Sequence, residues 1–346
     1  MYKSKHPLKF YTQILMEVHT LEIDSSQRDS NIYSSNLNDY TVTLENPIYD
    51  ITNFKLVSAR IPTPQFLICE TNNKLVFYTI DPAPNATLSG PQNATLPQGN
   101  YDGPGIANLF NSLGNNINLG MTYDASNNKF STGNPTYISD GSSVGTVILN
   151  FKTGDYGYDD SSASRTTLHQ ILGAPPEDIE ISNGSNTKFG AANFNGPNSL
   201  VLKISAGSDE FTQTVYTSTP FYTGHILLDG SDFINFNGAD DVVEHKFHSG
   251  SQKMIKDIRI QFFYMSHGRL IPYDFRYQDH ILKFQVECNT GKFKSLSKHT
   301  APDVGVLPPP ISIPDFEDPY RWRQYVLISI ILFFGVLTLV ITRKKA

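Results

Sequence analysis

Histidines and carboxylates are the residues of this sequence that could support acid–base or metal chemistry. His245 and His248 form an H-x-x-H pair. Successive side chains of a strand point to opposite faces, so this spacing separates the two rings and does not predict a metal site. Asp279 and His280, which we expect to lie inside paired strands, offer an acid–base pair, but no nucleophile motif lies beside them. A structural hydrogen-bonding role is therefore favoured for both residues.

Two loop segments have the composition of ligand loops but lack the required pattern. Residues 99–105 contain glycines without the Lys-Ser/Thr pair of a phosphate loop. Residues 154–160 are acidic but lack the EF-hand pattern that ends in Glu. We therefore expect no catalytic residue, no metal, no cofactor and no small-molecule substrate, and the sequence does not predict an enzyme.

A charged cluster near the start is a candidate for a structural or interaction role. Asp24, Arg28 and Asp29 lie within six residues of one another. An ion-pair network among them would fix the first turn of the chain. The alternative is that Arg28 binds a neighbouring subunit, because its planar guanidinium suits paired contacts with carboxylates.

The overall composition limits the classes of function. The chain has 346 residues, a formal net charge of −6 at pH 7, 39% hydrophobic residues and 17% charged residues. The hydrophobic fraction is sufficient for a core. Binding to nucleic acid needs clustered Lys and Arg, so the negative charge argues against specific nucleic-acid binding.

The cysteine content indicates a reducing compartment. Cys69 and Cys288 are the two cysteines, and we expect both to be buried thiols. Sequons occur at Asn85, Asn93 and Asn183. The first residues have no apolar stretch typical of a signal peptide, so we do not expect these sequons to carry glycans.

The elements that position these residues are mainly strands. Alternation of apolar and polar residues, interrupted by Asn and Pro, predicts short strands of an antiparallel sheet. The expected strands are 40–44, which should end at Asn46-Pro47, and 54–61, 74–80, 200–204, 211–216, 225–228, 258–264 and 281–287, the last as a partner of 258–264. Residues 123–130 predict a hairpin. The fold class is therefore mostly β, an antiparallel β-sandwich.

Helices are expected to be few and short. Ile106, Phe110 and Ile117 belong to an apolar set spaced by three and four residues, which predicts a helix from 106 to 117. A second short helix is expected over 165–172, ending at Gly173.

The C-terminal segment has the pattern of a single transmembrane helix. Residues 325–342 form about eighteen uncharged residues, near the lower limit for crossing a bilayer. Aromatic residues precede the run and cations follow it, as at membrane interfaces. The predicted anchor residues are Trp322, Tyr325, Leu327, Ile330, Phe333, Phe334, Leu337, Val340, Arg343, Lys344 and Lys345. The alternative is a buried core helix.

A proline-rich stalk is expected between the β region and this anchor. Residues 301–320 contain six prolines, which disfavour both helix and central strand. The competing interpretation is a PxxP ligand. The expected organisation is an N-terminal arm (1–19), a β-rich interaction domain (20–300) with a possible subdomain boundary near 180–200, the stalk (301–320), and the anchor with its basic tail (321–346).

An ordered set of motifs over residues 20–290 resembles the capsid-associated proteins of nucleocytoplasmic large DNA viruses, such as those of algae. The motifs are IDSSQRD at 23–29, Tyr33, DYTVTL at 39–44, LVSARIP at 56–62, LPQGNY at 96–101, the hairpin at 123–130, LHQILG at 168–173, Gly268-Arg269-Leu270 and Asp279-His280. Two departures occur: Ser34 stands where the family often has Pro, and residues 184–198 look like an added loop.

The resemblance implies a jelly-roll-like minor capsid protein of an icosahedral virus with an internal membrane. Its implied partners are the major and other minor capsid proteins and the internal lipid membrane. The expected location is the virion, with a single membrane pass and the large domain facing the capsid shell, on the cytosolic side during assembly. The alternative function is a tail-anchored receptor or adhesion module of a virus or a cell.

Overall fold

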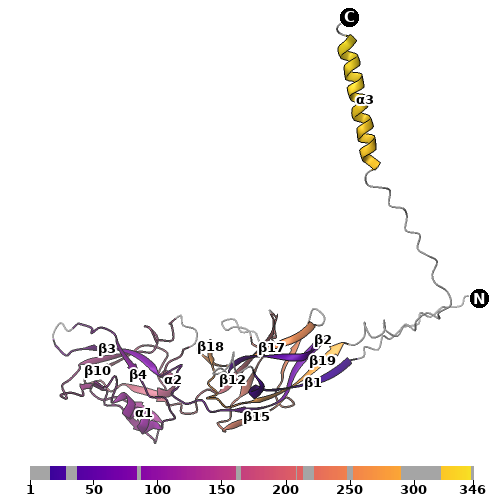
Figure 1. The fold of residues 1–346 in the computed structure, drawn as a ribbon. Coiled ribbons are helices and arrows are strands. Elements are labelled where there is room, and N and C mark those ends of the chain that lie inside the picture. Colours follow the sequence, from indigo (N-terminus) through magenta and orange to yellow (C-terminus); the bar gives the residue numbers. More distant parts are fainter. Residues whose placement is uncertain are drawn as a thin grey trace, which may run out of the picture. The chain divides into compact units, whose positions relative to one another are not determined.

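The computed structural model describes residues 16–28, 37–83, 87–160, 165–207, 209–212, 222–247, 252–289 and 321–343. The chain divides into two compact units, Met1–Gly291 and Lys292–Ala346. The first contains the β structure and the second contains helix α3, drawn in yellow in Figure 1. The expected stalk at 301–320, most of the N-terminal arm, and Asp29 lie outside the described residues.

A ten-stranded antiparallel sheet is the largest element of the first unit. Its order is β1 (Met16–Asp24), β19 (Ile281–Asn289), β2 (Asp39–Pro62), β17 (Gln252–Ser266), β12 (Ser199–Ala206) and β13 (Asp209–Glu210). Four strands pair off this path: β14 (Gly224–Leu227) with β12, β15 (Phe233–Asn237) and β16 (Val243–Lys246) with β2, and β18 (Arg269–Pro272) with β17. The expectation of a mostly β, antiparallel protein is confirmed.

Alternating burial explains why these segments are strands. Along β19, Leu282, Phe284, Val286 and Cys288 are buried while the residues between them are more exposed. Apolar side chains at every second position cover one face of a strand. The expected pairing of this strand with 258–264 is wrong, because β19 lies between β1 and β2.

The expectation that Asn46-Pro47 ends a strand is also wrong. Strand β2 runs through this dipeptide for 24 residues. Thr43 pairs with Asp257 and Ile48 pairs with Ile255, so the register shifts between them. Pro47 has no N–H to donate to a ladder, and the irregular stretch leaves it outside the paired positions.

Smaller sheets surround a second core. One has the order β10 (Ile179–Ser182), β9 (Thr146–Asn150), β3 (Lys74–Ile80) and β4 (Gln92–Thr95). Another has the order β11 (Lys188–Ala191), β7 (Lys129–Ser131) and β6 (Thr122–Asp124), and β5 (Ile117–Asn118) pairs with β8 (Thr136–Tyr137). The predicted strand at 74–80 and the hairpin that contains β6 and β7 are confirmed. The predicted strand at 211–216 lies mostly outside the described residues.

Helix α1 (Gly103–Phe110) is shorter than expected. It begins at Asp102, whose carboxylate accepts a hydrogen bond from the Gly105 N–H at 2.8 Å. It ends at Phe110, and the left-handed conformations of Gly114 and Asn115, with φ values of 59° and 60°, are incompatible with the expected continuation to residue 117. The apolar residues beyond it, including Ile117, are still buried in the same core.

Helix α2 (His169–Leu172) covers only the second half of the expected segment. It ends at Gly173, which has a φ of 66°. A Cβ at this position would collide with the Ala191 carbonyl group. Both the conformation and the close approach therefore require glycine here.

The first unit contains two separate hydrophobic cores. The core of the ten-stranded sheet takes its buried residues from 23–61 and 200–288. The second core takes its buried residues from the continuous stretch 67–192. In Figure 1 the elements of the two cores form two groups within this unit. Because residues up to 291 form one compact unit, the subdomain boundary near 180–200 stays a prediction.

Candidate functional site: two histidine clusters and an exposed apolar helix

A cluster of polar side chains, which we call the polar knot, connects the segment that follows β1 to the segment that precedes β19. Arg28 Nη1 donates to the Asp279 carboxylate at 3.0 Å and to the Ser25 carbonyl at 2.7 Å. The Ser25 hydroxyl donates to the same carboxylate oxygen of Asp279 at 2.8 Å. Asp24 caps the short 3-10 helix η1 (Ser25–Gln27) by accepting from the Ser26 N–H. The knot links residues more than 250 positions apart.

His280 lies beneath this knot in an apolar environment. Its Nε2 is 2.7 Å from the Tyr40 hydroxyl, and its backbone N–H donates to the Ser25 hydroxyl at 2.9 Å. Phe262 and Phe275 have ring centroids 4.8 Å from the imidazole. Burial lowers the pKa of His280 to about 3, and the nearby Arg28 charge adds to this effect. The ring is therefore neutral at neutral pH.

The knot does not form a catalytic relay. Serine, histidine and aspartate meet here, but the imidazole ring contacts Tyr40, while the Ser25 hydroxyl donates to Asp279. In a Ser-His-Asp relay the serine hydroxyl is bonded to a ring nitrogen of the histidine. The geometry instead suits a structural role that fixes the start of β19 against the turn after β1.

The structure brings together four of the five candidate interaction residues. Asp24, Arg28, Asp279 and His280 lie in the knot or directly beneath it. The described ion pair of Arg28 is with Asp279, which lies 251 positions away in the sequence. Asp279 and His280 precede β19 and are not part of a strand, which corrects the expected placement.

A pair of histidines in contact, His169 and His267, was not anticipated from the sequence. His169 Nε2 contacts His267 Nε2, and His169 Nδ1 contacts the Thr167 hydroxyl. The Tyr158 ring stacks on His267 with a centroid distance of 5.0 Å. His169 is 1% exposed, whereas His267 lies at the surface in the turn between β17 and β18.

Both rings of this pair are neutral near neutral pH. Burial is the main cause, and the charge that a protonated His267 would carry the second, of the lowering of the pKa of His169 to about 4. Burial also lowers the pKa of His267, with a second contribution from the Arg269 charge. One imidazole can therefore donate a hydrogen bond to the other, which two imidazolium rings cannot do.

The histidine pair belongs to the contact between the two cores of the first unit. Tyr264 in β17 bonds the Thr71 hydroxyl at 2.9 Å, and Ser266 bonds Thr166 at 2.6 Å. Arg269 Nη1 donates to the Asp160 carbonyl at 2.6 Å. The β17–β18 hairpin is thus held against the second core by polar contacts. The pair is separated by 98 positions, so local spacing gave no signal for it.

Metal chemistry is not indicated by the described part of the chain. Among the described residues, no group of three or more His, Cys, Asp or Glu side chains could hold a metal ion. Cys69 and Cys288 are buried free thiols. His248 lies outside the described residues, while His245 Nδ1 is 3.0 Å from the Thr212 carbonyl oxygen.

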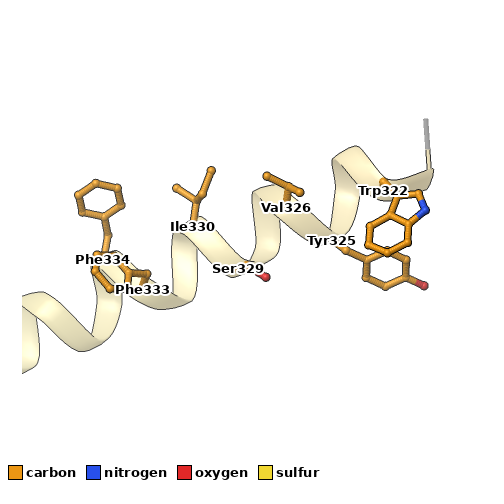
Figure 2. Close-up of a pocket in the computed structure, with 7 residues that line it drawn as sticks. All are labelled: Trp322, Tyr325, Val326, Ser329, Ile330, Phe333 and Phe334. Atoms are coloured by element: carbon orange, nitrogen blue, oxygen red, sulfur yellow. The ribbon is translucent and has the colours of Figure 1, made fainter. Parts of the chain in front are cut away.

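Helix α3 (Arg321–Arg343) is the main apolar surface of the second unit that the structure describes. Figure 2 shows Trp322, Tyr325 and Ile330 among the side chains that project from it. All described side chains at 325–336 are exposed, and Trp322 is 78% exposed. Side chains at 337–343, including the predicted anchor residues Leu337, Val340 and Arg343, are not described, and Lys344 and Lys345 lie beyond the described helix. Within the described residues, no helix is sufficiently long and apolar to cross a membrane.

A family model matches most of the first unit. Residues 13–269 match a family of unknown function (DUF5901). The chain belongs to this family. The DUF5901 match includes Arg28, the second core and the histidine pair. It ends at Arg269 in the β17–β18 hairpin, before the residues at 271–288 that complete the core of the ten-stranded sheet. No curated protein matches the chain.

Solved structures with similar arrangements come from virophages. A crystal structure of the mavirus penton protein has a TM-score of 0.37 and 11% identity, and the match covers 79% of this chain and 99% of that chain. A cryo-EM structure of the Sputnik virophage has a TM-score of 0.31 and 15% identity, and the match covers 82% and 99% of the respective chains. Scores at this level transfer neither a strand order nor a function to this member of DUF5901.

Proposed function

We propose that this DUF5901 protein is a structural component of a virus particle. In this proposal the β unit binds the inner face of the capsid shell through major and minor capsid proteins. Helix α3 lies in the internal membrane, and residues 301–320 connect the two. The jelly-roll-like arrangement and the algal-virus type of minor capsid protein are parts of the same proposal.

The proposal that α3 lies in the membrane rests on one observation: apolar side chains are exposed on all sides of this helix. Leu327, Leu332 and Phe333 are 60%, 64% and 66% exposed. At 3.6 residues per turn these three positions lie on different sides of the helix. A helix that is apolar on all sides is normally buried in a core or in a membrane. Leaving large apolar side chains in water costs about 1.5–3 kcal/mol each. Lipid would cover every side of such a helix.

The sequence beyond the described side chains supplies the remaining length. Residues 337–342 read LTLVIT and continue the uncharged run. With them the run reaches about eighteen residues, which a helix needs to cross the hydrocarbon layer with little tilt. Trp322 and Tyr325 at one end, and Arg343, Lys344 and Lys345 at the other, match the residues favoured at the two interfaces.

The ordered motifs of the β unit support the capsid half. Several of the motifs that resemble large-virus capsid proteins lie where the structure ties the unit together. The segment at 23–29 and Asp279-His280 form the polar knot. LHQILG at 168–173 supplies His169, and Gly268-Arg269-Leu270 directly follows His267 in the turn and the start of β18. These motifs therefore contribute contacts that hold the β unit together, as expected for a structural protein.

Flotation with liposomes tests the membrane half. We expect the full-length protein to float with vesicles and to resist a high-salt wash. Ile330→Asp with Phe333→Asp should prevent flotation, since each carboxylate at the middle of a span costs about 3 kcal/mol. The matched control is Ile330→Leu with Phe333→Leu, which keeps the apolar surface. Equal flotation of both variants would refute the anchor.

Extraction of purified particles tests the capsid half. A structural protein should be present in many copies, should resist salt, and should be released by detergent. It should also be protected from protease in intact particles. The alternative, a tail-anchored receptor or adhesion module, predicts few copies and cleavage of the β unit from outside. Absence from particles would overturn the capsid proposal while leaving the membrane result standing.

A further inference from the structure

A groove lies between two consecutive strands that do not pair with each other. Strand β14 pairs with β12, whereas β15 pairs with β2. The space between them is lined by residues of both strands and by the segment that leads into β16. We call this space the β14/β15 groove. Among the described pairings, the second edges of β14 and β15 have no partner strand.

The groove has an apolar floor and two exposed apolar residues at its rim. Ile226, Ile234 and Phe236 form the floor and belong to the core of the ten-stranded sheet. Leu227 and Val242 are 70% and 56% exposed at the rim. Unpaired strand edges beside apolar surface are templates for an added strand.

The charge of the groove is acidic. Asp229, Asp240 and Asp241 line it, and no Lys or Arg is among its described lining residues. The described contacts of these carboxylates are hydrogen bonds from neutral groups, such as the Val242 N–H to Asp241 at 2.8 Å. Arg60, whose guanidinium lies over the Phe233 ring at the start of β15, is not a lining residue. An occupant should therefore combine apolar and cationic side chains.

One segment of this chain has that combination at the period of a strand. Residues 2–11 read YKSKHPLKFY, and no acidic residue occurs before Glu17. In an extended conformation, alternate side chains point to opposite sides. Leu8 and Phe10 would then share one side, and Lys3, Lys5 and Lys9 would share the other. The apolar side matches the floor, and the lysines match the acidic rim.

The β15 side of the groove is too far from the start of the described chain for the segment of the same copy to cover it. Asn235 of β15 is level with Asp24 of β1 across the sheet. The pairs that connect them are Asn235 with Arg60, Arg60 with Ile281, and Ile281 with Asp24. Met16, where the described chain begins, lies at the other end of β1, eight positions from Asp24, or about 26 Å at ~3.3 Å per residue. The five steps from Met16 back to residue 11 span only about 17 Å.

We propose that the β14/β15 groove binds residues 2–11 of a second copy of this chain, as an added antiparallel or parallel strand. The apolar side chains at positions 8 and 10 cover the floor, and the lysines pair with the carboxylates at the rim. The contact links copies head to tail, because each copy offers both a segment and a groove. This inference does not depend on the membrane or capsid role.

Cysteine cross-linking of the full-length protein in detergent micelles tests this contact. Leu8→Cys and Leu227→Cys proteins are mixed and mildly oxidised, and we expect a disulfide-linked dimer. The control partner is Leu88→Cys, a position that is 52% exposed on the second core. Equal dimer yields with Leu227→Cys and Leu88→Cys would overturn the proposal.

Charge reversal and the double-cysteine protein complete the test. Asp240→Lys with Asp241→Lys should lower the dimer yield several-fold, and Lys3→Asp, Lys5→Asp and Lys9→Asp on the other copy should restore it. A chain with both cysteines should form linked oligomers. If this double-cysteine chain forms only an internal disulfide at every protein concentration, the segment binds its own copy and the proposal is wrong. No effect of charge reversal would exclude the lysine–carboxylate pairing.

Discussion

The Nε2 atoms of His169 and His267 are in contact, and this contact joins the two cores of the β unit. His169 comes from α2 in the second core, and His267 follows β17 of the ten-stranded sheet. The residues that face the pair are Tyr158, Thr167 and Gln170, with Arg269 as the charged group that acts on His267. A second proton on this pair would place two cations against each other.

Acidification should therefore weaken the β unit. The pKa of His169 falls from 6.5 to about 4 on folding, so the unfolded chain binds the proton first as pH drops. The contribution of His169 to the free energy of unfolding is fully present above pH 6.5. It is lost as the pH falls from 6.5 to 4, which lowers the free energy of unfolding by up to about 3 kcal/mol. Denaturant unfolding at pH 7 and pH 5 measures this loss. His169→Gln should make the profile less steep without making it flat, because the pKa of His280 also falls on folding and His280 destabilises the unit over the same pH range. His19→Gln on the surface of β1 is the control and should not change the profile.

Loss of the Arg28 side chain should destabilise the polar knot. The Arg28 side chain is 13% exposed, and Arg28→Ala leaves Asp279 and the Ser25 carbonyl without this donor. We expect a loss of about 1–2 kcal/mol and no change in any catalytic assay. Lys283→Ala is the control, because its ion pair with Glu22 is 46% and 56% exposed and should contribute less than about 1 kcal/mol. An unchanged melting temperature, together with unchanged particle assembly, would refute the role of Arg28.

The hydroxyl of Tyr40 should be required beneath the same knot. Tyr40→Phe removes the partner of His280 Nε2, and the buried Nδ1 of this ring already has no hydrogen-bond partner among the described residues. Burying an unpaired polar atom costs about 1–3 kcal/mol. Thermal unfolding should show the loss, while Tyr49→Phe, at a position 57% exposed, should leave the melting temperature unchanged.

Substitution of Gly173 should be destabilising because a Cβ would clash with a neighbouring backbone, and Gly184, which has no such neighbour, is the control. Gly173 and Gly184 both have left-handed conformations, with φ values of 66° and 79°. Added Cβ atoms would strike the Ala191 carbonyl in the first case and meet nothing within 4 Å in the second. Gly184→Ala should cost about 1 kcal/mol from the backbone alone, and Gly173→Ala clearly more. Equal melting temperatures would show that the loop around Ala191 yields to the methyl group.

The sequence predicted individual strands better than their partners. The alternation in 74–80 and 258–264 is a local property, and both segments are strands. Pairing depends on distant segments, so the position of β19 between β1 and β2 had no local signal. The stop expected at Pro47 failed because a register shift lets β2 continue past it.

The candidate residues show the same difference between local and distant information. Asp279 and His280 attracted notice as neighbours of unusual type, and the structure places them with Ser25 and Arg28. The His169–His267 pair depends on how the β17–β18 hairpin meets the second core. The residues around each histidine give no local signal for the contact between the hairpin and the second core, so sequence spacing alone could not predict the pair.

The pairing of β1 with β19 sets an order of events during folding. Residues 16–24 cannot enter the sheet until residues 281–289 have left the ribosome, because each strand of the pair needs the other. The second core comes from the continuous stretch 67–192 and depends on contacts of shorter range. Contacts between segments close in sequence form sooner, since less chain entropy is lost in closing them. The second core should therefore fold during synthesis, and the large sheet should close only after nearly the whole β unit has been made.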